Sequence, residues 1–599
     1  GSNSFTGPLS VQAGNLEVSG GSALADTTQV DLASGTQLLV SGNETIGALA
    51  GAGGVTVNNG FTLGLGGNNQ NSSFGGVIGG AGGLDKVGSG ALTLSGASTY
   101  GGGTSVSNGT LNVTGSLDSA VNVANGGTLT GSGSITDSVT VASGGALNAS
   151  SGQQLTVDGL NMAAGAQLNV ALGAPSTNAL VRVNGDLALN GTLNVSALND
   201  FGLGVYRLID YSGALSGSGL SLGSLPAAVL GDLATIQSIG NGQVNLVLQD
   251  DDSLLQFWDA GADTLGGILG GSGTWGIGQT TWTNITGTTA GVWTSGFAVF
   301  GGLNSGTVNV VGNQTATGLQ FTTDGYLLNG AGSIGTANGS SPLTVRVDSG
   351  LTATIDTQIT GNGGLTKRDF GTLILGGNND YLGDTTLSEG VLQVASDNNL
   401  GNGGDLLFNG GILRVTGTGF TGTSRDITWQ AGGGGFDIVD AGNTFTLGQS
   451  LGGSGGLSKD GAGILQLNGA SSYSGGTSLN AGSLVLGNDS AIGSGALNVT
   501  ANSNLGAAGD RNLTNALVLN TGTTLNLTGD DFTLNGLISG AGALNRSGSG
   551  DLTLNHANTY AGGTTIGGGT LTLGSNTALG TGGLTIAGAS NLDSASART

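Results

Sequence analysis

The stretch GGLDKVGSGALTLSGASTYGGGTSVSNGTLNV, residues 82–113, decides the fold because the chain repeats it. The same pattern recurs, with no insertion or deletion inside a copy, as GGLTKRDFGTLILGGNNDYLGDTTLSEGVLQV (363–394), GGLSKDGAGILQLNGASSYSGGTSLNAGSLVL (455–486) and GALNRSGSGDLTLNHANTYAGGTTIGGGTLTL (542–573). In every copy a leucine precedes a tyrosine at the same spacing, as Leu84 precedes Tyr100. A pattern kept over four copies indicates one structural unit that stacks on others like itself.

Within a copy the apolar residues alternate with polar ones, as in Leu92 and Leu94 and again in Leu111 and Val113. Alternation over three to five residues predicts short strands with one buried face. Two or three such strands in about 20 residues form one coil of a parallel β-solenoid, in which each strand pairs with its equivalent one coil along. Glycine supplies the positive-φ corners. We expect the tyrosine of each copy to be used in packing.

The pattern GGL-x-K-x-G-x-G-x-L-x-L, followed by N/S-x-Y and G-G-T, resembles the autotransporter-associated β-strand repeat of passenger domains in bacterial type V secretion. The resemblance implies an all-β fold, a right-handed parallel β-helix shaped as an elongated rod. With about 20–22 residues for each rise of about 4.8 Å, a rod of this length would measure roughly 130 Å. The end of the chain, 582–599, predicts at most one short strand, so we expect a passenger without its translocator β-barrel.

Composition excludes several classes of protein. The chain has 599 residues, 12 Lys+Arg against 36 Asp+Glu, and a net charge of −24, which disfavours nucleic acid and anionic membrane surfaces as partners. Hydrophobic residues make up 37% and charged residues 8%, the opposite of a disordered acidic tail. The sequence contains no run of about 18 apolar residues, so it predicts no membrane-spanning helix.

The sequence predicts three segments. Residues 1–250 form an N-terminal β-helix segment, closed by the acidic run 250–252, which we interpret as a solvated corner. Residues 251–330 form a Trp-rich junction that opens a second β-helix unit. Residues 331–599 form a C-terminal β-helix segment that carries three of the repeat copies.

The only histidine, His556, is the first candidate for catalysis. The other copies have Gly96, Gly377 and Gly469 at its position, so we interpret it as a turn substituent. Asp551, five residues before it, also stands at a variable position of the repeat. A catalytic triad needs a histidine held by a carboxylate and touching a nucleophile, and no GDSG- or GDSL-like motif supplies that nucleophile. We therefore predict that the chain is not an enzyme.

Other chemistry has as little support. A polysaccharide lyase needs a basic cluster beside its carboxylates, whereas Lys367 and Arg368 are the clearest basic pair and are expected to be solvated in a repeat turn. The chain has no cysteine and only three glutamates, which leaves no metal-ligand pattern. We expect neither a metal nor a cofactor.

The preferred hypothesis is a binding protein displayed on, or secreted from, a Gram-negative cell surface. By resemblance, such passengers act as adhesins or serum-resistance and immune-evasion factors, and some capture host regulators of complement or protease cascades. The partner would be a host extracellular or serum protein. The alternative is a structural repeat spacer without a ligand of its own.

Recognition of a protein usually needs aromatic or arginine anchors. We look for them where the chain departs from the repeat. The Trp-rich segment offers Trp275, Trp282 and Trp293, although these indoles could instead plug the end of a solenoid unit. The interval 395–450 offers the remaining candidates, which are Arg414, Phe420, Arg425 and Trp429.

Overall fold

The computed structural model describes residues 3, 7–176, 178–227, 233–239, 242–249, 255–261, 267–337 and 339–594. The acidic run 250–252 lies outside these residues. The chain divides into two compact units. Unit 1 comprises Gly1–Leu255, Leu265–Gly267 and Ile285–Thr288, and unit 2 comprises Gln256–Thr264, Ile268–Asn284 and Thr289–Thr599. Residues 251–330 thus contribute to both units, and their role as a separate junction domain stays a prediction.

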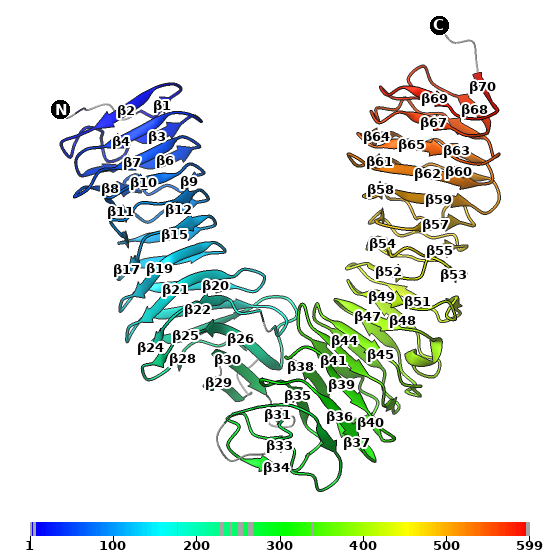
Figure 1. Cartoon of the computed structure of the whole chain (residues 1–599), viewed down its shortest axis with the longest axis horizontal. Helices are drawn as coiled ribbons and strands as arrows, with labels where there is room; N and C mark the ends of the chain where they lie inside the picture. The colour runs from blue at the N-terminus through cyan, green and yellow to red at the C-terminus, as the bar shows by residue number, and fades with distance from the viewer. Residues whose placement is uncertain are drawn as a thin grey trace. The chain divides into compact units, whose positions relative to one another are not determined.

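Unit 1 is a parallel β-solenoid, seen in Figure 1 as a stack of short strands from blue to teal. One side of the stack is a sheet of 11 strands, each hydrogen-bonded to its equivalent in the next coil. In spatial order these strands are β1 (Leu9–Val11), β3 (Gln29–Leu32), β6 (Ala48–Gly51), β9 (Ser72–Phe74), β12 (Ala91–Leu94), β15 (Gly109–Val113), β18 (Gly127–Gly131), β20 (Ala146–Ser150), β22 (Gln167–Leu172), β25 (Thr192–Ala197) and β28 (Ser221–Leu222).

Two further sheets complete the coils of unit 1. A sheet of four strands consists of β2 (Asn15–Val18), β4 (Gln37–Val40), β7 (Gly54–Val57) and β10 (Ile78–Gly80). A sheet of 15 strands includes β5 (Glu44–Ile46), β8 (Thr62–Leu65), β11 (Gly83–Lys86), β14 (Thr104–Val106), β17 (Val121–Val123), β19 (Ser134–Val141), β21 (Leu155–Met162), β23 (Val181–Val183) and β26 (Gly204–Tyr211).

The pairing register turns the alternating sequence pattern into a core. In the 11-stranded sheet Leu92 lies opposite Leu111, Leu111 opposite Leu129, and this column of leucines continues through Leu147 and Leu168. All five side chains are buried. A slip by one residue would turn the whole column outward, so the burial of these leucines fixes the register.

Unit 1 ends with a change of strand direction. The strands β29 (Leu233–Ile239) and β30 (Gln243–Gln249) form an antiparallel hairpin, and β30 pairs antiparallel with β26. The hairpin covers the edge that β26 would otherwise present. An uncovered strand edge can pair with further strands, so this cover protects the end of the sheet.

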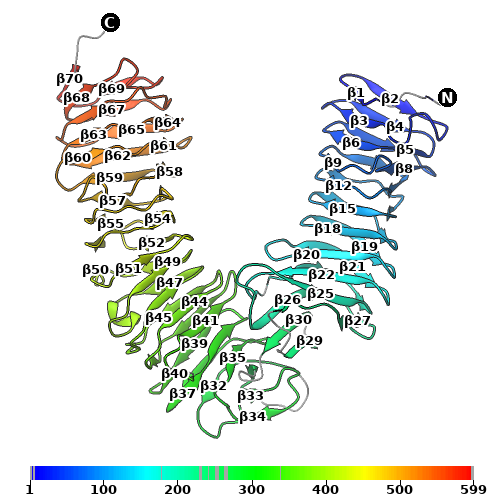
Figure 2. The same cartoon turned by 180° about the vertical axis from the view of Figure 1, so that it is seen from behind.

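Unit 2 repeats the solenoid design. Its 13-stranded sheet contains β32 (Gly273–Trp275), β36 (Thr307–Val310), β39 (Tyr326–Asn329), β42 (Thr352–Ile355), β45 (Thr372–Leu375), β47 (Val391–Val394), β49 (Ile412–Val415), β52 (Gly434–Ile438), β54 (Leu457–Asp460), β56 (Thr477–Leu479), β58 (Leu497–Val499), β61 (Leu517–Leu519) and β64 (Ile538–Gly540). Figure 2 shows this stack from behind, in green to orange.

The other main sheets of unit 2 have ten and nine strands. The first includes β31 (Leu255–Trp258), β33 (Trp282–Thr283), β34 (Ala290–Gly291), β35 (Phe297–Phe300), β38 (Gly318–Phe321), β41 (Leu343–Val347), β44 (Leu365–Arg368), β46 (Thr385–Leu387), β48 (Leu406–Phe408) and β51 (Ile427–Trp429). The second is β50 (Gly422–Thr423), β53 (Thr444–Leu447), β55 (Ile464–Leu467), β57 (Ser483–Leu486), β59 (Ser503–Ala507), β62 (Thr524–Gly529), β65 (Ala543–Arg546), β67 (Thr564–Ile566) and β69 (Leu584–Ile586).

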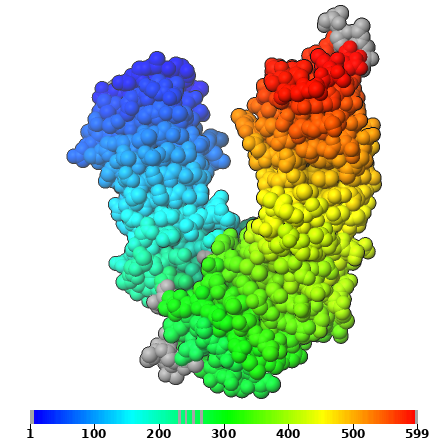
Figure 3. Space-filling model, turned by 45° about the vertical axis from the view of Figure 1, so that its right-hand side comes forward, coloured from blue at the N-terminus to red at the C-terminus, as the bar shows by residue number. Residues whose placement is uncertain are grey.

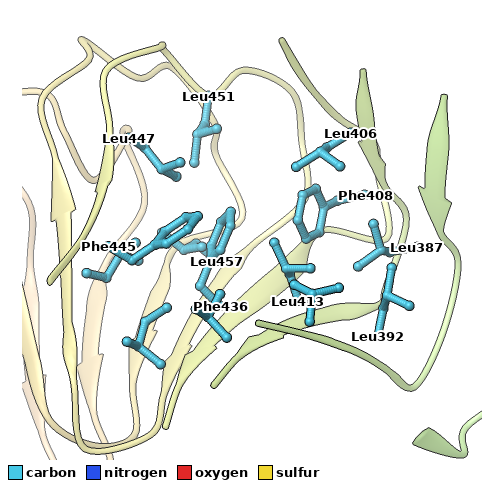
Figure 4. Packing of buried hydrophobic residues seen from close by; sticks show 14 of the residues in the cluster. Leu387, Leu392, Leu406, Phe408, Leu413, Phe436, Phe445, Leu447, Leu451 and Leu457 are labelled. Carbon is cyan, nitrogen blue, oxygen red and sulfur yellow. The ribbon is translucent and has the colours of Figure 1, made fainter. Parts of the chain in front are cut away.

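Apolar side chains from opposite sheets fill the interior of the unit 2 coils. In Figure 4, Leu387 and Phe408 from one sheet point toward Leu392 and Leu413 from another. All four are fully buried. Figure 3 shows the same stacks from outside, where the coils of each unit form a continuous surface.

The glycines of the GGT turn allow the coils to approach. A Cβ atom on Gly102 would lie 2.3 Å from the backbone carbon of Gly82 in the preceding coil. The third copy places Gly475 in the same situation, 2.4 Å from the backbone nitrogen of Gly456. No side chain fits at these distances, which explains why the repeat carries glycine there.

These observations confirm the all-β parallel solenoid. The interval 395–450, whose sequence departs from the repeat, nevertheless forms regular coils: β48, β49 and β52 pair in register with strands of the neighbouring coils. Its one short helix, the 3-10 helix η2 (Asp397–Leu400), begins with a capping box at Ser396. Among the described residues no helix is long and apolar enough to cross a membrane.

Candidate functional site

The basic residue of the repeat lies inside the solenoid. In three copies a lysine ammonium group donates to three backbone carbonyls that line a corner of the coil. Lys459 Nζ is 2.6 Å from Asp460 O, 2.8 Å from Gly461 O and 3.2 Å from Ala481 O, and Ala481 belongs to the following coil. Lys86 and Lys367 make the equivalent bonds. In the fourth copy Arg546 bonds the carbonyls of Gly529, Asp530 and Gly550.

The expectation that Lys367 is solvated is therefore wrong, because its side chain is fully buried. Burial lowers the pKa of Lys367 and that of Lys459 to about 8. Carbonyl oxygens at a tight corner have no strand partner, and a buried acceptor without a donor is costly. The lysine thus satisfies the backbone of its corner and offers no charge to a partner.

The second copy carries an additional ionic cluster at this corner. Asp369 has a φ of 64°, where the other copies have glycine, and its carboxylate accepts a hydrogen bond of 2.9 Å from Arg346 Nη1. The Asp369 N–H donates to the Glu389 carboxylate at 3.0 Å. Burial raises the pKa of Asp369 to about 6, against the opposing effect of Arg346. The cluster links neighbouring coils, since Arg346 lies on β41 and Lys367 on the adjacent β44.

The tyrosine of each copy is also internal, as expected. Tyr100, Tyr381, Tyr473 and Tyr560 are fully buried. Each hydroxyl bonds the threonine four residues later, which ends a Gly-Gly-Thr turn in three copies and a Gly-Asp-Thr turn in the second. The distance between Tyr473 Oη and Thr477 Oγ1 is 2.6 Å. The lysine, tyrosine and threonine of the signature therefore hold the coil and are unavailable to a ligand.

The Trp-rich segment forms a buried aromatic cluster at the first coils of unit 2. Trp258, Trp275 and Trp282 are buried, and Trp293 packs against the same core. The Trp282 ring lies 4.4 Å from Trp293, 5.2 Å from Trp275 and 5.6 Å from Phe300, measured between ring centroids. This packing fits the alternative interpretation of the indoles as a plug. Because Trp275 and Trp282 are buried, they cannot act as exposed anchors for a partner. Partner binding by Trp293 stays a prediction.

The two aromatic candidates of 395–450 are core residues as well. Phe420 and Trp429 are each 4% exposed. Phe420 packs edge-on against Phe445 at 5.0 Å, and Trp429 lies 4.9 Å from Phe408. Their positions on the inner side of the coils remove them from the surface, so neither can serve as an exposed anchor.

The two arginine candidates are paired with aspartates. Arg425, whose side chain is 7% exposed, forms two bonds of 3.0 Å to the Asp397 carboxylate and further bonds to the carbonyls of Gly401 and Gly404. It therefore fastens η2 to the next coil. Arg414 Nε lies 2.6 Å from Asp437 Oδ2, and its side chain is 34% exposed. Partner binding by Arg414 stays a prediction.

His556 is exposed, and the contact of its ring is 3.2 Å from Nδ1 to the neighbouring Ala557 carbonyl. Asp551, its nearest carboxylate in sequence, instead accepts from the Thr570 N–H of the next coil at 2.7 Å. Each residue is engaged with the local backbone, so the pair does not form the dyad that a triad requires. Among the described residues no group of three potential metal ligands gathers.

Sequence reasoning missed the outward side of the 11-stranded sheet. Asn148 on β20, Asn169 on β22 and Asn194 on β25 lie opposite one another in register and are half-buried. Their amides form a hydrogen-bonded row: Asn194 Nδ2 donates to Asn169 Oδ1, and Asn169 Nδ2 donates to Asn148 Oδ1, each at 2.9 Å. We call these three residues the asparagine row. Each asparagine follows a buried leucine in its strand, a pattern shared by many outward positions of the repeat, so the sequence alone did not single these three out.

The segments of the chain that match a known family contain the internal residues described above. The Passenger-associated-transport-repeat family matches residues 1–18, 84–113, 365–394, 457–486 and 544–573. The last four spans are the four quoted copies with their corner lysine or arginine and their buried tyrosine. These matches support an autotransporter passenger domain.

The chain is also similar to a larger protein. It is 36% identical over 316 residues to the Adhesin BmaC autotransporter of Brucella suis biovar 1 (strain 1330). The match covers 49% of the chain and 9% of that relative. The chain therefore spans only a small part of the length of this relative.

Proposed function

We propose that this passenger domain is a non-enzymatic adhesin, displayed on the cell surface or secreted, that binds host molecules through the outer faces of its coils. The observation that carries the proposal is the 36% identity over 316 residues to a protein named as an adhesin. The structure adds a physical reason. Because the signature lysine, tyrosine and threonine are engaged inside the coils, outward residues can vary without loss of the fold.

The partner on this proposal is a host extracellular or serum protein, or a molecule of the host cell surface. Capture of a host complement or protease-cascade regulator, and with it immune evasion, is the finer form of the same proposal. The alternative is a repeat spacer that only carries another module away from the cell. Arg414 and Trp293 are the two remaining anchors for a protein partner, because each keeps part of its side chain accessible.

The test is a binding assay with the whole domain. Fluorescently labelled domain is added to cultured host cells and to immobilised matrix and serum proteins, with serum albumin labelled in the same way as the control. Saturable binding that unlabelled domain displaces supports the adhesin. A signal no greater than that of albumin on every surface would leave the spacer as the function of this domain.

A further inference from the structure

The asparagine row borders an open groove of about 360 Å³ on the outer face of the 11-stranded sheet of unit 1. Figure 2 labels the contributing strands β18, β20, β22 and β25 in succession. Thr130 precedes the row on β18, and Ser224 follows it beyond β28. Beside the row run Ser150, Ala171 and Ser196, which the register places opposite one another. Because these side chains are short, they leave the space that forms the groove.

The row is fixed in orientation by its own hydrogen bonds. The Ser224 N–H donates to Asn194 Oδ1 at 3.0 Å, so donors point in one direction from Ser224 through Asn194 and Asn169 to Asn148. An asparagine amide has two N–H donors and two acceptor lone pairs. Asn169 uses one of each within the row, which leaves one donor and one acceptor for solvent or a ligand. Such a preoriented set lowers the entropy cost of binding.

The chemistry of the lining selects the class of ligand. No lining residue of this groove is charged, in a chain whose net charge is −24. A polyanion is repelled by the field of the whole domain, and the groove has no carboxylate to hold a cation. The lining also has no aromatic or arginine residue of the kind that anchors proteins. Paired amide donors and acceptors with neighbouring hydroxyls instead match the vicinal hydroxyl groups of a sugar.

The spacing selects a polymer over a single sugar. Equivalent residues recur once in each coil, about 4.8 Å apart along the stack. One coil offers only a few hydrogen bonds of modest net strength. A chain of linked sugars that lies along the row engages several coils at once, and linkage turns the later contacts into intramolecular ones.

The geometry points to a neutral polysaccharide site in this groove, in which an extended glycan lies across β18, β20, β22 and β25 and hydrogen-bonds the asparagine row. This site rests on the proposed adhesin function and gives it a ligand class. Unit 2 has a comparable row, Asn504, Asn526 and Asn545, with Asn526 Nδ2 donating to Asn504 Oδ1 at 3.2 Å. There the strand β62 that carries Asn526 is followed directly by Asp530 and Asp531, so two carboxylates lie at the end of this strand.

The test titrates the full domain with neutral N-acetylglucosamine oligomers, from monomer to hexamer, by calorimetry. Affinity should rise with oligomer length and level off once the oligomer spans the row. Heparin, as the anionic probe, should not bind. A hexamer that does not bind, an affinity independent of length, or heparin binding at the groove would overturn the site.

Four variants locate the binding. Asn169→Asp removes a donor and adds charge, and Ala171→Phe fills the groove without altering the row; each should weaken hexamer binding by at least about tenfold. The matched variants Asn526→Asp and Thr528→Phe stand at the same places relative to the unit 2 row and should leave affinity unchanged. Equal losses in both units would overturn the groove as the site. Circular dichroism melts confirm folding, and if Asn169→Asp does not fold, Ala171→Phe decides.

The outcomes separate this site from the proposed function. A domain that binds host cells but no neutral oligomer refutes the glycan site and leaves the adhesin in place. A domain that binds the oligomers but no host surface refutes the adhesin. Sedimentation at the same concentrations detects the other occupant, a second copy of the chain: self-association abolished by Asn169→Asp, without oligomer binding, would assign the groove to that copy instead.

Discussion

Replacement of the corner lysine, Lys459→Met, should loosen the third repeat copy while the chain keeps its fold. Methionine preserves the length of the side chain but removes the ammonium group that serves the carbonyls of Asp460, Gly461 and Ala481. Each hydrogen bond to a charged group contributes about 1.5–3 kcal/mol. The variant also escapes the desolvation of a buried ammonium, which costs several kcal/mol. The difference between these two effects lowers the free energy of unfolding of the third copy by about 2–4 kcal/mol.

In a solenoid the loss is local, because each coil contacts only its neighbours. Hydrogen exchange measured by mass spectrometry should therefore show amides of 455–486 exchanging about 30- to 1,000-fold faster. Peptides from the first copy, 82–113, serve as the internal reference and should not change. Lys459→Arg is the matched variant, since Arg546 occupies this position in the fourth copy, and should cost less than half as much. Unchanged or slower exchange in Lys459→Met would refute the assignment of the lysine as the donor for its corner.

Three further predictions concern the core, the corners and the pH dependence. Leu413→Ala, which empties a fully buried position, should lower the free energy of unfolding in urea by about 3–5 kcal/mol, against less than about 0.5 kcal/mol for the exposed Leu382→Ala. Gly102→Ala should destabilise by several kcal/mol or prevent folding, because its Cβ would overlap Gly82, while the adjacent Gly101→Ala, with open space around it, should be nearly neutral in the same assay. Burial raises the pKa of Tyr100, Tyr381, Tyr473 and Tyr560, so their contribution to stability is complete below the unfolded pKa near 10 and is lost as the pH rises above it. Alkaline titration of the phenolate absorbance should show these four tyrosines ionising only on unfolding, and ionisation in the native state would contradict their burial.

Lys459 adds a contribution of the opposite sign to the pH dependence. Its folded pKa, about 8, lies below the ordinary value of 10.5, so the folded state gives up the proton first. Stability from this group rises as the pH increases from about 8 to about 10.5. Urea unfolding of the wild type and of Lys459→Met across this range should show the difference between them widening, and a constant difference would contradict the lowered pKa.

The sequence by itself determined the class of fold. Leucine and valine alternate with polar residues at a fixed period, and this local pattern can bury one face only if equivalent strands stack. The glycines of the GGT turn and the buried tyrosine follow from the same repetition. For these features the local pattern and the tertiary contact coincide, because each coil meets a copy of itself.

The candidate site was less predictable. From the sequence alone, an aromatic or basic residue is easily interpreted as an exposed group that a partner could contact. In the structure Trp282, Phe420 and Lys367 point inward. Whether such a residue faces the core or the solvent depends on one step of register, and outside the clear repeats the sequence does not fix that step. The pairing of Arg425 with Asp397, which lie 28 residues apart, likewise arises only when one coil lies on the next.

Only the tertiary structure joined the residues of the asparagine row and its groove. Asn148, Asn169 and Asn194 are separated by 21 and 25 residues, and nothing in the sequence around any one of them differs from an ordinary exposed strand position. The parallel register places their amides side by side and hydrogen-bonds them into one row. The repeat determines that coils stack, whereas the surface that a ligand meets is set by which residues the stacking aligns, because side chains from separate coils become neighbours only across the hydrogen-bonded strands.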